Sequence, residues 1–141
     1  MHEHTDLRIN SMREELTSLG VKELKTAEEV NNELSNKEGT MLLVINSVCG
    51  CAAGNARPAV KIAVQNKKIP ERLTTVFAGQ DPEATAQARS YFSEYPPSSP
   101  SMVLFKNGEV VFMLPRDKIE GRNAMDISKD LIEKFEEYCW I

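Results

Sequence analysis

Apolar residues recur along the first part of the chain with the spacing of an amphipathic helix. Between Thr5 and Gly20 they are three or four positions apart, at Ile9, Met12, Leu16 and Leu19. This period predicts a helix that packs along one side. Thr5 or Asp6 is suited to its N-cap and Gly20 to its stop, and a short extended piece over 21–24 follows.

A second helix and a buried strand come next. Thr26 and Glu29 fit a capping box, which predicts a helix that begins there. The run 41–46 is apolar on both faces and predicts a fully buried strand. The segment after it is predicted to be helical to about Gln65, and Pro58 should kink this helix or mark the first turn of its main body.

In the second half of the chain, apolar runs typical of strands alternate with segments that have helical spacing, and the chain closes with a hairpin and a helix. The predicted elements are a strand at 73–78, a helix from Asp81 to about Phe92, strands at 102–105 and 110–113, and a helix at about 125–138. Asp81 and Pro82 suit the cap and the first helical position. Asn107 and Gly108 between two apolar runs are typical of a hairpin turn.

This order of elements predicts an α/β fold in which a mixed sheet is covered by helices on both faces. No repeat, low-complexity tract or long linker divides the sequence, so residues 1–141 are expected to form a single domain.

Composition narrows the setting. The net charge of −4 disfavours a nucleic-acid or anionic-membrane partner. Three cysteines are too few, and odd in number, for a disulfide-stabilised secreted protein, and no secretory signal is recognised. No apolar run approaches the roughly 18 residues of a membrane span. We therefore expect a cytoplasmic protein whose partners are proteins or small molecules.

Two thiols one residue apart are the main chemical feature. Cys49, Gly50 and Cys51 follow the run 41–46 and precede small, helix-compatible residues. Such a pair can attack a disulfide and then form a bridge with itself, and a strand-to-helix junction supplies backbone N–H groups that favour a thiolate. Cys49 is the candidate nucleophile because it comes first, where the strand ends. Cys51 is the candidate resolving thiol.

Other roles for these cysteines stay open. A free cysteine often packs as a small apolar residue, in which case Cys51 would lie under the helix and Cys49 would work with an external thiol. The pair also offers two ligands to zinc or an iron–sulfur cluster, but only Cys139, His2 and His4 remain to complete the set. All three lie near the chain ends, so we expect no metal site.

The C-x-C spacing constrains the disulfide that the pair would form. It closes a ring of about 11 atoms, against about 14 for C-x-x-C, so an acceptable S–S torsion must be reached with fewer free bonds. We expect strain that raises the reduction potential above that of a comparable C-x-x-C pair. Gly50 would relieve part of it by allowing backbone angles forbidden to other residues.

Four segments together resemble the bacilliredoxin family, which has the thioredoxin fold. They are Asn46-Ser47-Val48-Cys49-Gly50-Cys51-Ala52, Phe77-Ala78-Gly79-Gln80-Asp81, Pro97-Ser98-Ser99-Pro100-Ser101, and Pro115-Arg116 with Ile119-Glu120-Gly121. The resemblance implies a thioredoxin-like three-layer sandwich, with a central mixed sheet flanked by helices. It also implies an enzyme that removes bacillithiol from mixed disulfides on protein cysteines, with Cys49 and Cys51 as the active-site pair.

The same resemblance implies roles around the pair. Pro100 would be cis and would leave the main chain of Ser99 open to an extended substrate. Gly50, which lies between the two thiols, would also contact the substrate. From their place near the start of the helix after the thiols, Arg57 and Lys61 are candidates to lower the thiolate pKa or to meet the malate carboxylates of bacillithiol, with Arg57 the preferred one. The alternatives are a trans Pro100, a Ser99 that is only a turn residue, and an Arg57 that is simply solvated. Arg116 and Glu120 suggest an ion pair rather than chemistry.

Several functions follow from this set of residues. The first is a debacillithiolating thiol-disulfide oxidoreductase with no tightly bound cofactor, bacillithiol as co-substrate, bacillithiolated proteins as targets and a recycling reductase as partner. The second is a general protein disulfide reductase or isomerase. The third is a non-enzymatic redox-sensing or metal-binding module.

Overall fold

A five-stranded mixed sheet forms the centre of the computed structural model, which describes residues 2–139. The strands lie in the order β1-β3-β2-β4-β5. Their bounds are β1 Lys22–Glu23, β2 Thr40–Asn46, β3 Arg72–Phe77, β4 Ser101–Lys106 and β5 Glu109–Leu114. The first three run parallel to one another, and β4 and β5 are antiparallel to their neighbours. The central strand β2 is buried along its whole length, as the apolar run predicts.

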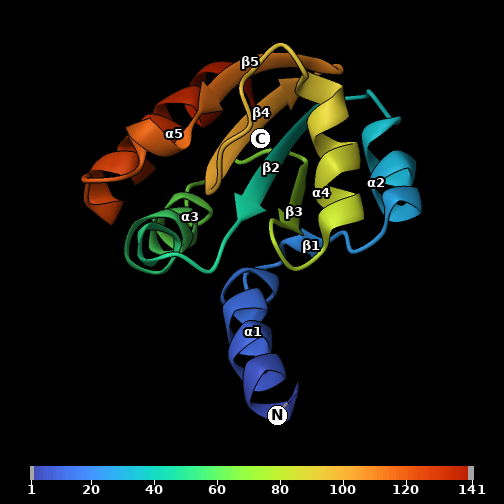
Figure 1. Cartoon of the computed structure of the whole chain (residues 1–141). Coiled ribbons are helices and arrows are strands. Elements are labelled where there is room, and N and C mark those ends of the chain that lie inside the picture. The colour runs from blue at the N-terminus through green and yellow to red at the C-terminus, as the bar shows by residue number, and fades with distance from the viewer. Residues whose placement is uncertain (1, 140–141) are drawn as a thin grey trace.

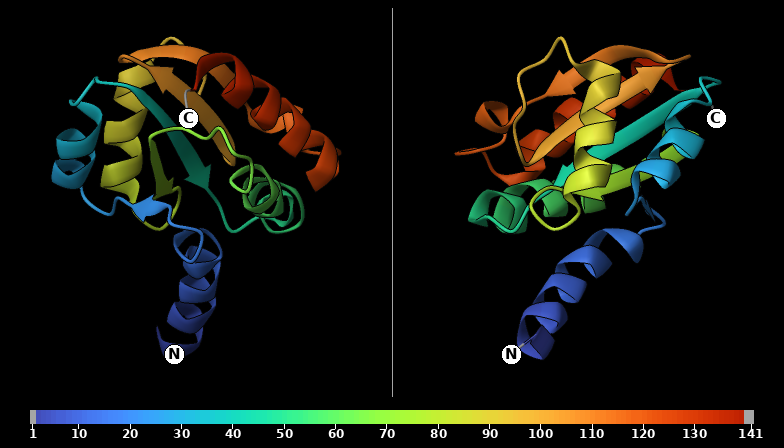
Figure 2. Two further views of the ribbon diagram at one scale, coloured as in Figure 1. Left: turned by 180° about the vertical axis from the view of Figure 1, so that it is seen from behind. Right: turned by 45° about the vertical axis from the view of Figure 1, so that its right-hand side comes forward.

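Helices cover both faces of this sheet (Figures 1 and 2). On one face, α2 (Ala27–Leu34) and α4 (Pro82–Arg89) pack over an apolar cluster that includes Leu43 and Ile45. On the other face, α3 (Arg57–Ala63) and α5 (Ala124–Tyr138) pack over a cluster that includes Leu42 and Val44. Alternate residues of β2 therefore face opposite layers, and the three-layer α/β sandwich is confirmed.

The predicted strands, hairpin and later helices are present with small shifts at their ends. Asn107 and Gly108 form the hairpin turn, with φ of 52° and 84° respectively, in the region that asparagine and glycine adopt most easily. The helix expected to end near Phe92 is α4, prolonged by a 3-10 turn over Ser90–Phe92. Thr26 accepts a hydrogen bond from the Glu29 N–H, as its capping motif predicts.

The first helix differs from its prediction at the N-terminal end. The helix α1 spans His2–Thr17, so Thr5 and Asp6 lie inside it rather than at its cap. No glycine or proline interrupts residues 2–4, and the sequence there is compatible with helix. The C-terminal end of α1 is close to the expected one, since the chain turns at Gly20 with a φ of +88°. None of the described helices is both long and apolar enough to cross a membrane.

An ion cluster attaches the C-terminal half of α1 to the sheet, while its N-terminal half extends away from the body (Figure 1). Arg13 Nη1 lies 2.6 Å from Glu23 Oε2 and 2.7 Å from Asp81 Oδ2, and its guanidinium lies over the Phe77 ring. Asp81 occupies the cap position of α4, but its side chain makes no capping hydrogen bond. Its carboxylate binds Arg13 instead, a long-range contact that local sequence does not reveal.

Candidate active site

The two neighbouring thiols lie where β2 ends and a helix begins. The chain leaves the sheet after Asn46, and helical conformation starts at Gly50. Cys49 and Cys51 are both free and partly exposed, and their Sγ atoms are 2.8 Å apart. The main chain is held here by bonds within the loop: Cys49 N–H donates to Ser47 Oγ, and the N–H groups of Ala52 and Ala53 donate to Cys49 O. The predicted strand-to-helix position of the pair is therefore observed.

The environment of Cys49 favours its thiolate. Partial burial raises the pKa of this thiol, but hydrogen bonds from the Cys51 side chain, the Ser47 hydroxyl and the backbone N–H groups of Ala52 and Cys51 lower it by more. The net result is a pKa of about 7 for Cys49, against an ordinary value of 9.0. A large fraction of this thiol is thus ionised near neutral pH, the state needed for nucleophilic attack.

Cys51 has the opposite tendency. Burial, together with the hydrogen bond to Cys49 and the negative charge there, raises the pKa of Cys51, and the Arg116 guanidinium offsets only part of this rise. Of the two adjacent sulfurs, one is therefore ionised and the other keeps its proton. The proton on Cys51 is the one that stabilises the Cys49 thiolate, so the two thiols work as one unit.

The helix that carries the thiols is irregular in its first turns. Ala52–Ala56 form a π-helical turn, in which Arg57 N–H donates to Ala52 O, and α3 follows. Pro58 lies in the first turn of α3 and has no N–H to give to the carbonyl four residues earlier, which explains why the turn before it is widened. Of the two outcomes expected for Pro58, this places it in the first turn of the main helical body.

Arg57 is buried, so the alternative of a simply solvated side chain is wrong. Its side chain is 2% exposed. Nη1 donates to Asn46 Oδ1 at 2.9 Å and to Ser47 O at 2.8 Å, and Nε donates to Glu15 Oε1 on α1 at 2.9 Å. The guanidinium therefore fixes the loop that precedes Cys49 from beneath.

The loop before β4 contains a cis peptide bond between Ser99 and Pro100, as the family resemblance implied. Pro100 is buried and Ser99 is partly exposed. The Ser99 carbonyl, expected to be open to substrate, accepts a hydrogen bond from Arg116 Nη1 at 3.4 Å, and the Ser98 hydroxyl accepts one from Arg116 N–H. A substrate strand that uses the Ser99 carbonyl would therefore share this oxygen with the guanidinium or displace it.

Arg116 is the exposed cation of the site, and sequence analysis underestimated it. The expected ion pair with Glu120 is present, with Nη2 3.4 Å from Oε2. In addition, the negative charges of Cys51, Cys49 and Glu120 raise the pKa of Arg116, so its guanidinium acts on the thiols. Its spacing to Glu120 gave a signal for the ion pair, but its approach to residues 49–51 depends on tertiary structure.

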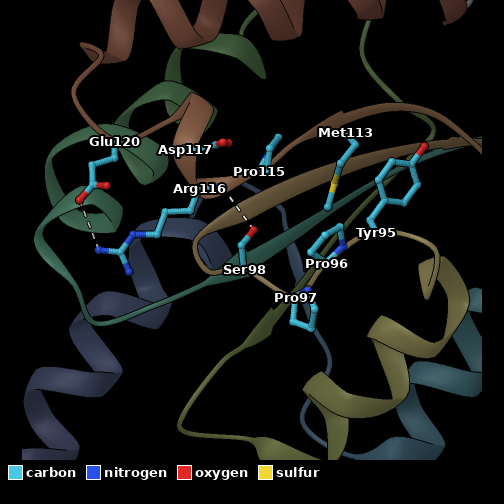
Figure 3. A pocket seen from close by; sticks show the side chains of 9 residues that line it. All are labelled: Tyr95, Pro96, Pro97, Ser98, Met113, Pro115, Arg116, Asp117 and Glu120. Atoms are coloured by element: carbon cyan, nitrogen blue, oxygen red, sulfur yellow. Dashed lines mark hydrogen bonds and ion pairs between the residues drawn. The ribbon is translucent and has the colours of Figure 1, made fainter.

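A pocket of about 380 Å³ opens beside Arg116 and the Ser99–Pro100 loop (Figure 3). Much of its lining is apolar and comes from residues 95–97 and from the end of β5: Tyr95, Pro96, Pro97, Met113 and Pro115. The polar part consists of Ser98, Arg116, Asp117 and Glu120. The lining comes from two segments, 95–98 and 113–120, that are 15 or more residues apart in sequence. No periodic pattern brings them together, which is why sequence analysis gave no indication of the pocket.

Gly50 is not required by the backbone of the reduced site. Its φ lies outside the left-handed region, and a Cβ added there would meet nothing within 4 Å. A need for glycine at this position would therefore come from the oxidised form or from contact with substrate, as predicted for Gly50.

Cys139 lies apart from the pair. It is buried at the end of α5, where burial raises the pKa of its thiol and the Thr40 hydroxyl contacts it. Thr40 begins β2 and Cys49 follows the end of that strand, so the third cysteine is at the opposite end of the sheet. It does not complete a ligand set with Cys49 and Cys51. The side chains of His2 and His4 lie outside the described ones.

Comparisons with known proteins agree on the class of site. The family described as "Disulphide isomerase" matches residues 5–139. A bacilliredoxin of Bacillus licheniformis is 55% identical over 129 residues, which cover 91% of this chain and 90% of that protein. A bacilliredoxin of Salinibacter ruber is 56% identical over 133 residues, covering 93% of this chain and 78% of its own length.

Solved structures agree on the fold. A protein described as an oxidoreductase with a thioredoxin fold superimposes with a TM-score of 0.61 at 15% identity, covering 82% of this chain and 93% of its own. The thioredoxin of Fasciola hepatica gives a TM-score of 0.54 at 19% identity, covering 84% of this chain and 99% of its own. The three-layer sandwich is therefore a thioredoxin fold.

Proposed function

Because the chain belongs to the bacilliredoxin family and is thereby a thiol-disulfide oxidoreductase, we propose that it removes bacillithiol from mixed disulfides on protein cysteines. Cys49 is the nucleophile and Cys51 the resolving thiol. Bacillithiol is the co-substrate, and no cofactor is tightly bound. The reaction takes place in the cytoplasm, where a reductase returns the pair to its dithiol form.

The reaction takes two exchange steps. The Cys49 thiolate attacks the bacillithiol sulfur of the mixed disulfide, forms an S–S bond with it, and releases the target cysteine as a thiolate that takes up a proton. The Cys51 thiol then gives up its proton and attacks Cys49, which forms the Cys49–Cys51 disulfide and expels bacillithiol. Both steps conserve the number of disulfides, so no other oxidant or reductant is consumed until the enzyme is recycled.

The difference between the two thiols is the observation that supports this order of events. A pKa of about 7 leaves Cys49 ionised and nucleophilic near neutral pH, while the raised pKa of Cys51 keeps it protonated until the first step has neutralised its neighbour. Once Cys49 carries bacillithiol, its negative charge is gone, and the charge repulsion that raises the pKa of Cys51 is removed. The Arg116 guanidinium then favours the Cys51 thiolate.

The test follows bacillithiol by mass. Wild type, Cys49→Ser and Cys51→Ser are each incubated with a bacillithiolated protein, and the masses of enzyme and target are recorded over time. We expect transfer to wild type and to Cys51→Ser, a persistent adduct on Cys51→Ser, and no transfer to Cys49→Ser. A target that keeps its bacillithiol in the presence of wild-type enzyme would contradict the proposal.

A general protein disulfide reductase or isomerase is the second candidate, because the family that matches residues 5–139 is described as a disulphide isomerase. The two candidates differ in substrate. Bacillithiol, glutathione and cystine adducts of one target protein are compared at equal concentration. If glutathione or cystine adducts are cleared as fast as bacillithiol adducts, the second candidate replaces the first.

A further inference from the structure

Apart from Arg116, the residues that line the pocket beside the Ser99–Pro100 loop have no role in the two exchange steps. Figure 3 shows Met113 beside Tyr95 with its end toward Pro96, Pro97 next to Pro96, and Ser98 and Arg116 farther along toward Glu120. Pro96 and Pro97 are exposed, and Tyr95 and Met113 are partly exposed. A hollow lined in this way presents apolar surface to water, which favours an apolar ligand.

The charged residues of the pocket disfavour an anionic ligand. Asp117 and Glu120 contribute two negative charges and Arg116 one positive charge, so these three side chains sum to −1. The Arg116 guanidinium is already paired with the Glu120 carboxylate. A small thiol that carries two carboxylates, as the malate of bacillithiol does, would be repelled here, whereas a neutral or basic peptide segment would not.

The pocket and the thiols are connected through two shared features. Ser98 lines the pocket and immediately precedes the cis Ser99–Pro100 bond. Arg116 also lines it, donates to the Ser99 carbonyl, and acts electrostatically on Cys51 and Cys49. A polypeptide whose modified cysteine reaches Cys49 along this loop therefore has neighbouring residues at the pocket.

We propose that this pocket binds an apolar side chain of the target protein next to its bacillithiolated cysteine, and that Asp117 and Glu120 select against targets with acidic residues at that place. This inference rests on the proposed function and adds its target specificity. The volume of about 380 Å³ admits an aromatic side chain together with part of the adjoining main chain.

The experiment compares substrates that differ only beside the cysteine. Three bacillithiolated peptides carry Phe, Ser or Asp next to the modified residue, and a fourth substrate, the mixed disulfide of bacillithiol with 2-mercaptoethanol, has no peptide. For wild type we expect kcat/KM to be about tenfold higher for the Phe peptide than for the Ser peptide, and lowest for the Asp peptide. Raising the salt concentration should reduce only the difference between the Ser and Asp peptides.

Variants of the pocket then test which residues cause the preference for the Phe peptide and against the Asp peptide. Met113→Gln makes the apolar wall polar, and Asp117→Asn removes one negative charge. Val110→Thr is the control, because Val110 is partly buried on the same strand and packs against the same apolar cluster but does not line the pocket. Met113→Gln should abolish most of the Phe preference, Asp117→Asn should restore activity on the Asp peptide, and Val110→Thr should keep the wild-type pattern.

Binding without reaction gives an independent measurement. Peptides with Ser in place of the modified cysteine are titrated into isotope-labelled protein, and the amide signals of Ser98, Met113 and Arg116 are followed by NMR. The Phe peptide should shift them at lower concentration than the Ser peptide. This result does not require bacillithiol transfer, so it still tests the pocket if the transfer experiment fails.

The outcomes that overturn the inference are distinct from failure of the proposed function. Equal rates and equal binding for Phe and Ser peptides would exclude an apolar side-chain site. A loss in Met113→Gln that is the same for all four substrates, the peptide-free one included, would mean that the pocket holds bacillithiol itself. If wild type transfers bacillithiol from none of the substrates, the proposed function fails, and the NMR titration alone decides the role of the pocket.

Discussion

At the scale of single residues, the main contributions that lower the pKa of Cys49 come from neighbours that carry no charge. Three of the groups that lower its pKa are the Ser47 hydroxyl and two backbone N–H groups, and the fourth is the Cys51 thiol. No lysine or histidine takes part among the causes identified. The site thus lowers the pKa through hydrogen bonds fixed by the loop conformation, which makes the loop itself a determinant of reactivity.

Replacing Ser47 by alanine tests this directly. The substitution removes one hydrogen bond to the thiolate and one acceptor for the Cys49 N–H, so the pKa of Cys49 should rise, by roughly 0.5 to 1 unit. The measurement is the rate of iodoacetamide alkylation as a function of pH. It is made in a Cys51→Ser background, so that Cys49 is the only thiol of the pair that can react. An unchanged pH midpoint would show that the hydroxyl does not act on Cys49.

Arg57 is buried and bonded to the loop before Cys49, so its removal should lower the stability of the fold. Arg57→Met leaves the Ser47 carbonyl without its guanidinium donor and removes one of the donors to Asn46 Oδ1, which should lower the free energy of unfolding by about 2 kcal/mol. Urea unfolding measures the change. Lys61→Met on the same helix is the control, because Lys61 is exposed, and a shift there above about 0.5 kcal/mol would count against a specific role of Arg57.

At the scale of elements, the junction between β2 and the helix determines how easily the pair forms a disulfide. Gly50 is helical in the reduced protein, and its surroundings leave room for a side chain. Gly50→Ala should therefore stabilise the reduced fold by about 0.5 to 1 kcal/mol and restrict the backbone angles open to the oxidised ring. By this reasoning the reduction potential of the pair should rise by about 10 to 20 mV.

The measurement is equilibration of the pair in thiol-disulfide redox buffers. Wild type itself is expected to lie above the roughly −270 mV of thioredoxin, because of the shorter C-x-C ring. Gly54→Ala is a matched control, since Gly54 is also helical with open space at its Cβ position but lies outside the ring. It should stabilise both redox forms and leave the potential unchanged. A wild-type potential as low as that of thioredoxin would contradict the strain argument.

Elements with a strong local signal could be predicted from sequence, and features that arise from long-range contacts could not. The strand β2 and the hairpin turn at Asn107 and Gly108 follow from an apolar run and from backbone angles, both of which are local. The burial of Arg57 depends on α1, which supplies Glu15 from 42 residues away. The same holds for the approach of Arg116 to the thiols, so the candidate nucleophile was found from sequence but much of its surroundings was not.

At the scale of the whole molecule, the sheet brings the parts of the site together from distant segments. Cys49 follows the end of β2, and Pro100 directly precedes β4, the antiparallel neighbour of β2, so the thiols and the cis-proline loop meet at one edge. Arg116 comes from the turn after β5, the next strand along. The thiolate is therefore stabilised only when the fold is complete, which couples the ionisation of Cys49 to global stability.

This coupling predicts that the reduced protein becomes more stable between about pH 7 and pH 9. The fold lowers the pKa of Cys49 from 9.0 to about 7, so in this window the folded state has lost a proton that the unfolded chain still holds. Because the unfolded state binds more protons, the free energy of unfolding increases as pH rises, by about 1 kcal/mol for a partly exposed group. Below pH 7 this contribution is absent. The raised pKa of Cys51 has the opposite sign and lowers stability above its unfolded value.

Urea unfolding of the reduced protein at pH 6, 7.5, 9 and 10 measures the effect, with Cys49→Ser as the reference that lacks the titrating thiol. The difference in unfolding free energy between wild type and Cys49→Ser should grow in favour of wild type from pH 6 to pH 9. Titrating groups away from the pair are common to both proteins and cancel in this difference. Cys51 does not cancel, because its raised pKa depends on Cys49, and it should reduce the difference at pH 10. Parallel curves from pH 6 to pH 9 would mean that the fold does not favour the thiolate, and the nucleophile would then require activation by the bound substrate instead.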